Sequence, residues 1–198
     1  MDSSLTWKPH IKYICNKMSK CIGVIRKARP LLNRSSLITL YYTFLYPYMT
    51  YCLHVWGGTY QNTLLPIVKI QKAAIRTIFG LSKYHESSSL FKELQILKFN
   101  DVYTCNINTF VFRYLTDKLP IIFNNFFVTN ADIHHYNTRI RNQFHIPICR
   151  TTLSQMTFKY MAVKQWNECG YHLIKSSGIN ISLTKFKNLL RIKLLTTY

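Results

Sequence analysis

The acidic residues are the first place to look for catalysis, because enzymes that make or break phosphodiester bonds use converging carboxylates. Two-metal phosphoryl transfer needs at least two carboxylates on ions about 4 Å apart. In this chain the acids are scattered singly: Asp2, Glu86, Glu93, Asp101, Asp117, Asp132 and Glu168. Helix starts and solvated helix faces account for such isolated acids. We therefore predict no catalytic residue and no carboxylate metal site in this chain.

Two further chemistries are suggested only weakly by residue spacing. His145 with Cys149, and Cys169 with His172, each have a spacing that could supply two zinc ligands. No CxxC pair supports them, so ordinary thiols and surface imidazoles are the favoured interpretation. The phosphate loop GxxxxGK[ST], the GxGxxG turn and the GxSxG elbow do not occur. We predict no metal and no cofactor for this chain.

The basic residues point to a binding function. The chain has 26 Lys and Arg against 7 Asp and Glu, a formal net charge of +19. Self-repulsion of this size favours a polyanionic partner, nucleic acid first and an anionic membrane surface second. A charged face that is merely solvated is the competing interpretation for each residue. The predicted nucleic-acid contacts are Lys8, Lys12, Lys69, Lys72, Arg76, Arg139 and Arg141.

Among these contacts, the segment TRIR (Thr138 to Arg141) has the most specific spacing. Its two arginines alternate along an extended or looped backbone, so they are expected to point the same way. That geometry suits adjacent phosphates.

Apolar periodicity predicts the helices that position these residues. We expect helices over residues 8–28, from Ser35 or Ser36 to about Tyr46, over 64–79 and over 87–97, and one from Asn100 or Asp101 to about 115. Pro47 should break or kink the second helix, and Gly80 should end the third. Beyond a loop-rich stretch, residues 154–169 and 184–195 read as helices. The predicted fold is mainly α: a helical domain at 1–118, then a smaller loop-rich α segment at 119–198.

A run from Ser35 to Val68 contains no charged side chain. A membrane span is disfavoured, because this run contains Pro47, His54 and tyrosines through its middle. We expect instead that Leu45 to Gly58 forms a buried wall of the helical domain. The six cysteines, without CxxC or a secretory leader, are expected to be reduced intracellular thiols.

Several short motifs in a fixed order resemble one protein family. They are LTWKPHI, LYPYMTYCLHVWGG, IVKIQKAAIRTIFG, YNTRIRN, QWN and LTKFKNLL. In this order they resemble the C-terminal third of the polyprotein of jockey-like non-LTR (LINE-type) retrotransposons, downstream of the reverse transcriptase palm. The family positions besides Arg76, Thr138 and Arg139 are Trp7, His10, Tyr48, Tyr51, Trp56, Gly57, Gln71, Trp166 and Asn167.

The resemblance implies a thumb-like helical domain that packs beside a palm and follows a primer-template duplex. The family's catalytic aspartates, in an [FY]xDD turn, and its endonuclease have no counterpart in this sequence. Magnesium is therefore implied only for the missing palm. After Trp166-Asn167, where relatives usually continue with Leu-Pro, this chain reads Glu168-Cys169-Gly170, which suggests a different helix end.

Two functions remain open at this point. The first is part of an RNA-directed DNA polymerase that binds and positions RNA or an RNA-DNA duplex, inactive by itself. The second is a non-catalytic interaction or scaffold protein with a basic surface. We expect no membrane partner, contact with the missing palm, self-association if the palm is absent, and a nuclear or cytoplasmic location.

Overall fold

Helix α1 (Lys8–Ala28) is the first element of the chain in the described residues, and its apolar spacing predicts it. The computed structural model describes residues 5–178 and 180–198. Pro9 lies in the first turn of α1, where no partner for its missing N–H is needed. Ile11, Ile14, Met18, Ile22 and Ile25 are buried on one face of the helix. The mainly α fold is confirmed. Among the described residues, β-type pairing is an isolated antiparallel bridge between Thr129 and Phe144.

The second predicted helix differs from expectation at both ends. Asn33, not Ser35 or Ser36, caps α2 (Arg34–Leu40), because its side-chain oxygen accepts a hydrogen bond from the Ser36 amide at 2.8 Å. The helical path does not stop near Tyr46. It continues through a π-helical turn, η1 (Tyr41–Leu45), into α3 (Tyr46–Thr50).

The π-helical turn explains why Pro47 does not end this helix. Proline in a helix interior has no amide to donate, and its ring presses on the carbonyl four residues earlier. In the wider turn the Tyr46 amide bonds to the Tyr41 carbonyl, five residues back. Pro47 therefore does not break the helix, and the predicted alternative, a kink at Pro47, stays a prediction. The chain turns later, at Cys52 with φ of 50°, before the short α4 (Leu53–Trp56).

Helix α5 (Gln61–Phe79) matches the third predicted helix and starts three residues earlier. Leu64, Ile67, Ala74 and Ile78 are buried as predicted, whereas Ile70 is half-buried. Gly80 ends α5 with φ of 72°, and the Leu81 amide bonds back to the Arg76 carbonyl at 3.0 Å. This is the expected glycine helix end.

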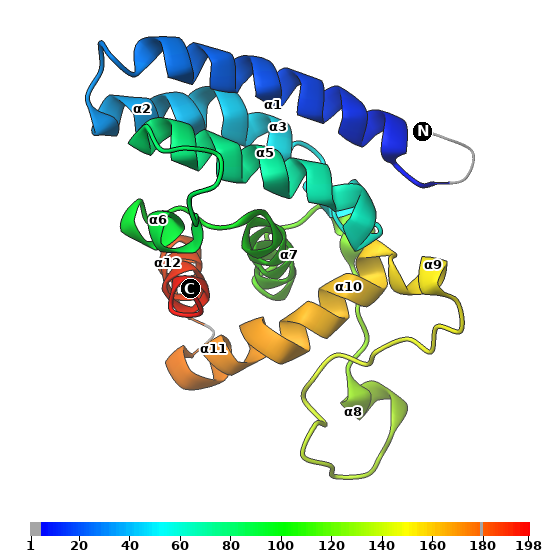
Figure 1. The fold of residues 1–198 in the computed structure, drawn as a ribbon. Coiled ribbons are helices and arrows are strands. Elements are labelled where there is room, and N and C mark those ends of the chain that lie inside the picture. Colours follow the sequence, from blue (N-terminus) through cyan, green and yellow to red (C-terminus); the bar gives the residue numbers. More distant parts are fainter. Residues whose placement is uncertain (1–4, 179) are drawn as a thin grey trace. The chain divides into compact units, whose positions relative to one another are not determined.

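Helices α1 and α5 lie side by side and run in the same direction (Figure 1). Lys8 and Lys12, early in α1, lie near Asn62 in the first turn of α5. At the other end, the Arg29 guanidinium just after α1 lies against Gly80. The two helices therefore pair N-terminus with N-terminus.

The next two helices differ from their predicted bounds. Ser87 occupies the cap position of α6 (Ser88–Glu93) without a side-chain hydrogen bond, and this helix ends four residues before the predicted Leu97. Helix α7 (Phe99–Leu115) starts before Asn100 and Asp101, so both lie inside its first turn. Its amide at Phe99 is satisfied by Gln71 instead, which no local sequence signal indicates.

The described chain forms two compact units. Within the described residues, the first unit is 5–103 with Leu194–Tyr198, and the second is 104–193 without residue 179. Helix α7 runs from one to the other, so this division does not test the predicted domain boundary between residues 118 and 119, which stays a prediction.

The second unit contains the late helices. The predicted helix over residues 154–169 is α9 (Thr152–Gln155), α10 (Phe158–Gln165) and a π-helical turn, η3 (Trp166–Gly170), which leads into α11 (Tyr171–Ser177). α12 (Leu183–Leu195) matches the last prediction within one residue. The 3-10 turn η2 (Ile121–Phe123) and α8 (Asn130–Ile133) lie between α7 and α9. Buried aromatic rings fill the interior, with Phe112 and Phe186 stacked at 4.4 Å between centroids.

Candidate nucleic-acid interface

A groove runs between the N-terminal halves of α1 and α5 in the first unit. It encloses about 420 Å³. Two of the predicted contacts, Lys8 and Lys12, belong to it, and both side chains are exposed. The remaining lining residues are Ile11, Cys15, Asn16, Asn62, Thr63 and Pro66, and most of the exposed lining is apolar. To this mostly apolar groove Lys8 and Lys12 contribute two ammonium groups, and Asn16 and Asn62 contribute two amides.

The two helices that form the groove are basic without any acidic side chain. Helix α1 carries six Lys or Arg and α5 carries three, and neither contains Asp or Glu. In the described part of the first unit, Arg34 forms an ion pair with Glu93 at 2.7 Å, away from the groove lining. The positive charge of α1 and α5 thus has no counter-charge on the helices themselves, which favours an anionic ligand.

The three basic residues predicted on α5 do not share one environment. Lys69 is exposed and follows Pro66 by three positions, which places it on the same side of the helix as Asn62. Arg76 donates from Nε to the His85 carbonyl at 2.6 Å, which ties it to the loop after α5. Lys72 is half-buried and lines a different pocket. Of the three, Lys69 best continues the groove.

The pocket beside Lys72 also includes Lys98, Asp101 and Tyr198. The Tyr198 hydroxyl donates to the Asp101 carboxylate and accepts the Lys98 amide at 2.7 Å. Burial raises the pKa of Asp101, against the hydrogen bond from Tyr198 and the charge of Lys98. Burial and the contact with Asp101 also raise the pKa of Tyr198. This network binds the last residues of the chain to the first turn of α7.

Cys15 and the amides of the groove were not among the predicted contacts. Asn62, Pro66 and Lys69 recur at positions i, i+4 and i+7, opposite the apolar stripe of α5, so this spacing is a signal that could have located the outer face. No sequence pattern indicates that this face of α5 lies beside α1. Burial raises the pKa of the Cys15 thiol, so it is a weak nucleophile at neutral pH.

Several residues of the family-like motifs lie in the core of the first unit. The His10 ring stands edge-on to both Trp7 and Trp56, with centroids at 5.8 and 5.6 Å. Burial lowers the pKa of His10. Trp56 is buried, and Gly57 lies so close to the Tyr103 ring that an added Cβ would come within 2.5 Å of it.

Gln71 is a buried polar residue with a full set of partners. Its amide nitrogen donates to the Tyr41 hydroxyl and to the Leu97 carbonyl, both at 2.9 Å. Its oxygen accepts the Phe99 amide at 2.8 Å. Gln71 therefore joins α5 to the π-helical turn and to the start of α7.

The expectation of a buried wall from Leu45 to Gly58 holds for one side of that segment only. Leu45, Met49, Leu53, Trp56 and Gly57 are buried. Four side chains in or next to this segment are exposed, and we call them the aromatic row: Phe44, Tyr48, Tyr51 and Val55. Tyr51 is 72% exposed. The segment is uncharged on both sides, although only one side faces other helices.

In the second unit, Arg139 and Arg141 are exposed on a loop. The backbone there is not extended, because the Arg141 amide bonds to the Thr138 carbonyl at 3.1 Å in a turn. Strand-like alternation is therefore not what orients these arginines. Trp166 is buried, and Asn167 bonds to the backbone of Phe144.

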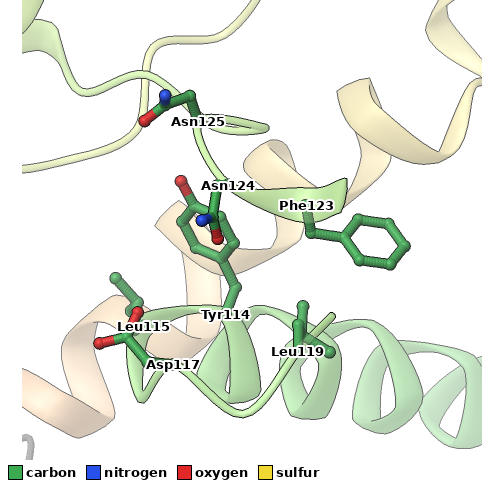
Figure 2. Close-up of a pocket in the computed structure, with 7 residues that line it drawn as sticks. All are labelled: Tyr114, Leu115, Asp117, Leu119, Phe123, Asn124 and Asn125. Atoms are coloured by element: carbon green, nitrogen blue, oxygen red, sulfur yellow. The ribbon is translucent and has the colours of Figure 1, made fainter. Parts of the chain in front are cut away.

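A separate cavity of about 390 Å³ lies at the C-terminal end of α7 and the loop that follows (Figure 2). Its polar lining consists of Asp117, Asn124 and Asn125. None of the predicted site residues lines it.

No group of three or more His, Cys, Asp or Glu side chains that could hold a metal ion occurs within residues 5–178 and 180–198. In the same residues no helix has the length and apolar character needed to cross a bilayer. All six cysteines are unpaired.

The sequence and structure were compared with protein-family models, curated proteins and solved structures, and none of these matches.

Proposed function

We propose that this chain is the thumb and downstream part of a jockey-like non-LTR retrotransposon reverse transcriptase, in which it binds and positions RNA or an RNA-DNA duplex. The order of short motifs supports the family assignment. The groove between α1 and α5 is the single observation that carries the binding function, because Lys8 and Lys12 line it on helices without a carboxylate.

The proposed binding is electrostatic and independent of base sequence. Exposed ammonium groups on a helix neutralise phosphates as point charges, and release of counterions then makes affinity fall with salt. No phosphoryl transfer is proposed for this chain, whose acids are scattered singly.

The test is binding of a labelled RNA-DNA hybrid to the full chain, followed by fluorescence anisotropy over a series of salt concentrations. Lys8→Glu/Lys12→Glu should weaken binding by about tenfold or more at low salt and reduce the salt slope by about 2, because roughly one phosphate contact is lost per lysine. The matched control is Lys20→Glu/Lys27→Glu, which makes the same charge change at exposed positions of α1 outside the groove lining.

The control should retain most of the affinity. Equal losses of affinity in both double variants would show that net charge alone accounts for binding, and would contradict the groove as the binding site. Salt-insensitive binding by the unmodified chain would contradict the electrostatic mechanism.

The aromatic row favours a second candidate function, a protein-interaction or scaffold role. Phe44, Tyr48, Tyr51 and Val55 present uncharged area to solvent on a unit that is otherwise basic. Aromatic side chains of this kind dominate protein interfaces. Trp56, although in the same segment, is buried, so its substitution tests folding and not partner binding.

A further inference from the structure

A loop in the second unit has a base fixed by hydrogen bonds. We call residues 134–142 the TRIR loop. Thr129 and Phe144 form an antiparallel bridge below it. Around that bridge the Asn130 amide donates to the Gln143 carbonyl at 3.0 Å, and the His145 amide donates to the Val128 carbonyl at 2.8 Å. The two ends of the loop are therefore held together.

Two asparagine side chains hold the same base from either side. Asn130 donates from Nδ2 to the Ile140 carbonyl at 2.9 Å, inside the TRIR loop. Asn167 donates to the Phe144 carbonyl at 2.8 Å and accepts the Phe144 amide at 3.3 Å. Asn167 follows the buried Trp166, so its position is set by the core of the unit. The loop is thus presented from a rigid support.

The outer surface of the TRIR loop is aromatic and basic. Tyr136 is 78% exposed, and its ring has no aromatic or cationic partner among the described residues. Arg139 and Arg141 are exposed in the following turn. The sequence contains no acidic residue between Asp132 and Glu168 to offset them. An exposed aromatic ring and exposed guanidinium groups on one loop are the combination that binds an unpaired nucleotide, with the base on the ring and phosphates on the arginines.

We propose that the TRIR loop is a single-strand binding site, in which one unpaired base of RNA or DNA stacks on Tyr136 while Arg139 and Arg141 contact the flanking phosphates. The site rests on the proposed function only in that nucleic acid is the ligand. It differs from the groove in the nucleic acid that it binds, which is a single strand and not a duplex. Bases inside a duplex are stacked on one another, so an exposed tyrosine ring gains a base only from a single-stranded segment.

The experiment measures binding of a labelled oligouridine RNA to the full chain by fluorescence anisotropy. Tyr136→Ala should weaken binding by about tenfold, because one stacking contact is lost. Tyr136→Phe should bind like the unmodified chain, since it keeps the ring. The matched control is Tyr84→Ala, which removes a ring of similar exposure, 84%, from a loop of the first unit.

The arginines have a separate readout. Arg139→Gln/Arg141→Gln should reduce the dependence of log affinity on log salt by about 0.7 for each arginine, the value for single strands. Tyr136→Ala should leave that slope unchanged, because an uncharged ring releases no counterion. Equal oligouridine binding by Tyr136→Ala and the unmodified chain would overturn the proposal. Oligouridine binding that Tyr84→Ala weakens as much as Tyr136→Ala would overturn it as well.

Failure of this site is distinguishable from failure of duplex binding. Lys8→Glu/Lys12→Glu tests the groove with the RNA-DNA hybrid, and Tyr136→Ala tests the TRIR loop with oligouridine. If Tyr136→Ala does not weaken oligouridine binding while Lys8→Glu/Lys12→Glu still weakens hybrid binding, the single-strand site is contradicted and the groove is not. Binding of anionic phospholipid vesicles that depends on Tyr136, without oligouridine binding, would assign the loop to a membrane surface and overturn the proposal.

Discussion

Gln71 shows how a single polar residue in an apolar pattern carries structural information. It falls on the buried stripe of α5 with Leu64, Ile67, Ala74 and Ile78. A glutamine at such a position is stable only if its amide is fully hydrogen-bonded. Its three bonds, to Tyr41, Leu97 and Phe99, meet that requirement. The type and position of Gln71 predict buried partners, but the identity of those partners depends on the tertiary fold.

Replacing Gln71 by leucine should destabilise the protein by about 2–4 kcal/mol, because the buried Phe99 amide and Leu97 carbonyl lose their bonds with Gln71. Urea denaturation followed by circular dichroism measures the change. The control, Gln61→Leu, makes the same substitution at an exposed position in the first turn of α5. It should change stability by less than about 0.5 kcal/mol. A Gln71→Leu protein as stable as this control would show that the three bonds contribute little.

At the scale of elements, the long amphipathic helices were predictable, and the ends of the other helices were less so. Helix α1 has the predicted bounds, and α5 and α12 differ from prediction by three residues or fewer. Those helices bury one apolar stripe, which a period of 3.6 residues reveals. The errors occur where neighbouring residues offer alternative local structures for the same turn or helix end. Pro47 is accommodated by the π-helical turn, and Asn33 takes the cap that Ser35 or Ser36 was expected to supply.

The pairing of α1 with α5 leads to a prediction about Cys15, which lines the groove. A bound RNA-DNA hybrid should protect Cys15 from modification by a maleimide. Cys52, exposed and outside the groove lining, should react at an unchanged rate. Because burial raises the pKa of Cys15, its reaction should become faster as the pH rises, as more thiolate forms. Peptide mass spectrometry after timed labelling distinguishes the two cysteines.

Equal labelling of Cys15 with and without the hybrid would place the bound duplex elsewhere. Protection of both cysteines to the same degree would indicate association of protein molecules and not occupation of the groove.

At the scale of the whole molecule, two features oppose each other. The net charge of +19 keeps copies of the chain apart, while the aromatic row offers them an apolar contact. At physiological ionic strength salt screens charge repulsion over distances beyond about 8 Å, but it does not weaken the apolar contact. Self-association should therefore increase with salt in the absence of nucleic acid.

Sedimentation velocity at tens of micromolar protein checks this prediction. The unmodified chain should associate at physiological salt, and Tyr48→Ser/Tyr51→Ser should shift it toward monomer without changing hybrid binding. A monomer at every salt concentration would contradict the role given to the aromatic row. Self-association that the tyrosine substitutions abolish would support the scaffold candidate if hybrid binding is also absent.

The sequence by itself determined the mainly α fold, most of the helices and the excess of positive charge. These follow from local periodicity and composition, which do not depend on distant contacts. The tertiary structure decided which residues share a site. It placed Lys8 and Lys12 beside Asn62, assigned Lys72 to another pocket and fixed the base of the TRIR loop through Asn167. It also left one side of Leu45 to Gly58 exposed. Such groupings depend on packing between residues far apart in the chain, about which helical periodicity carries no information.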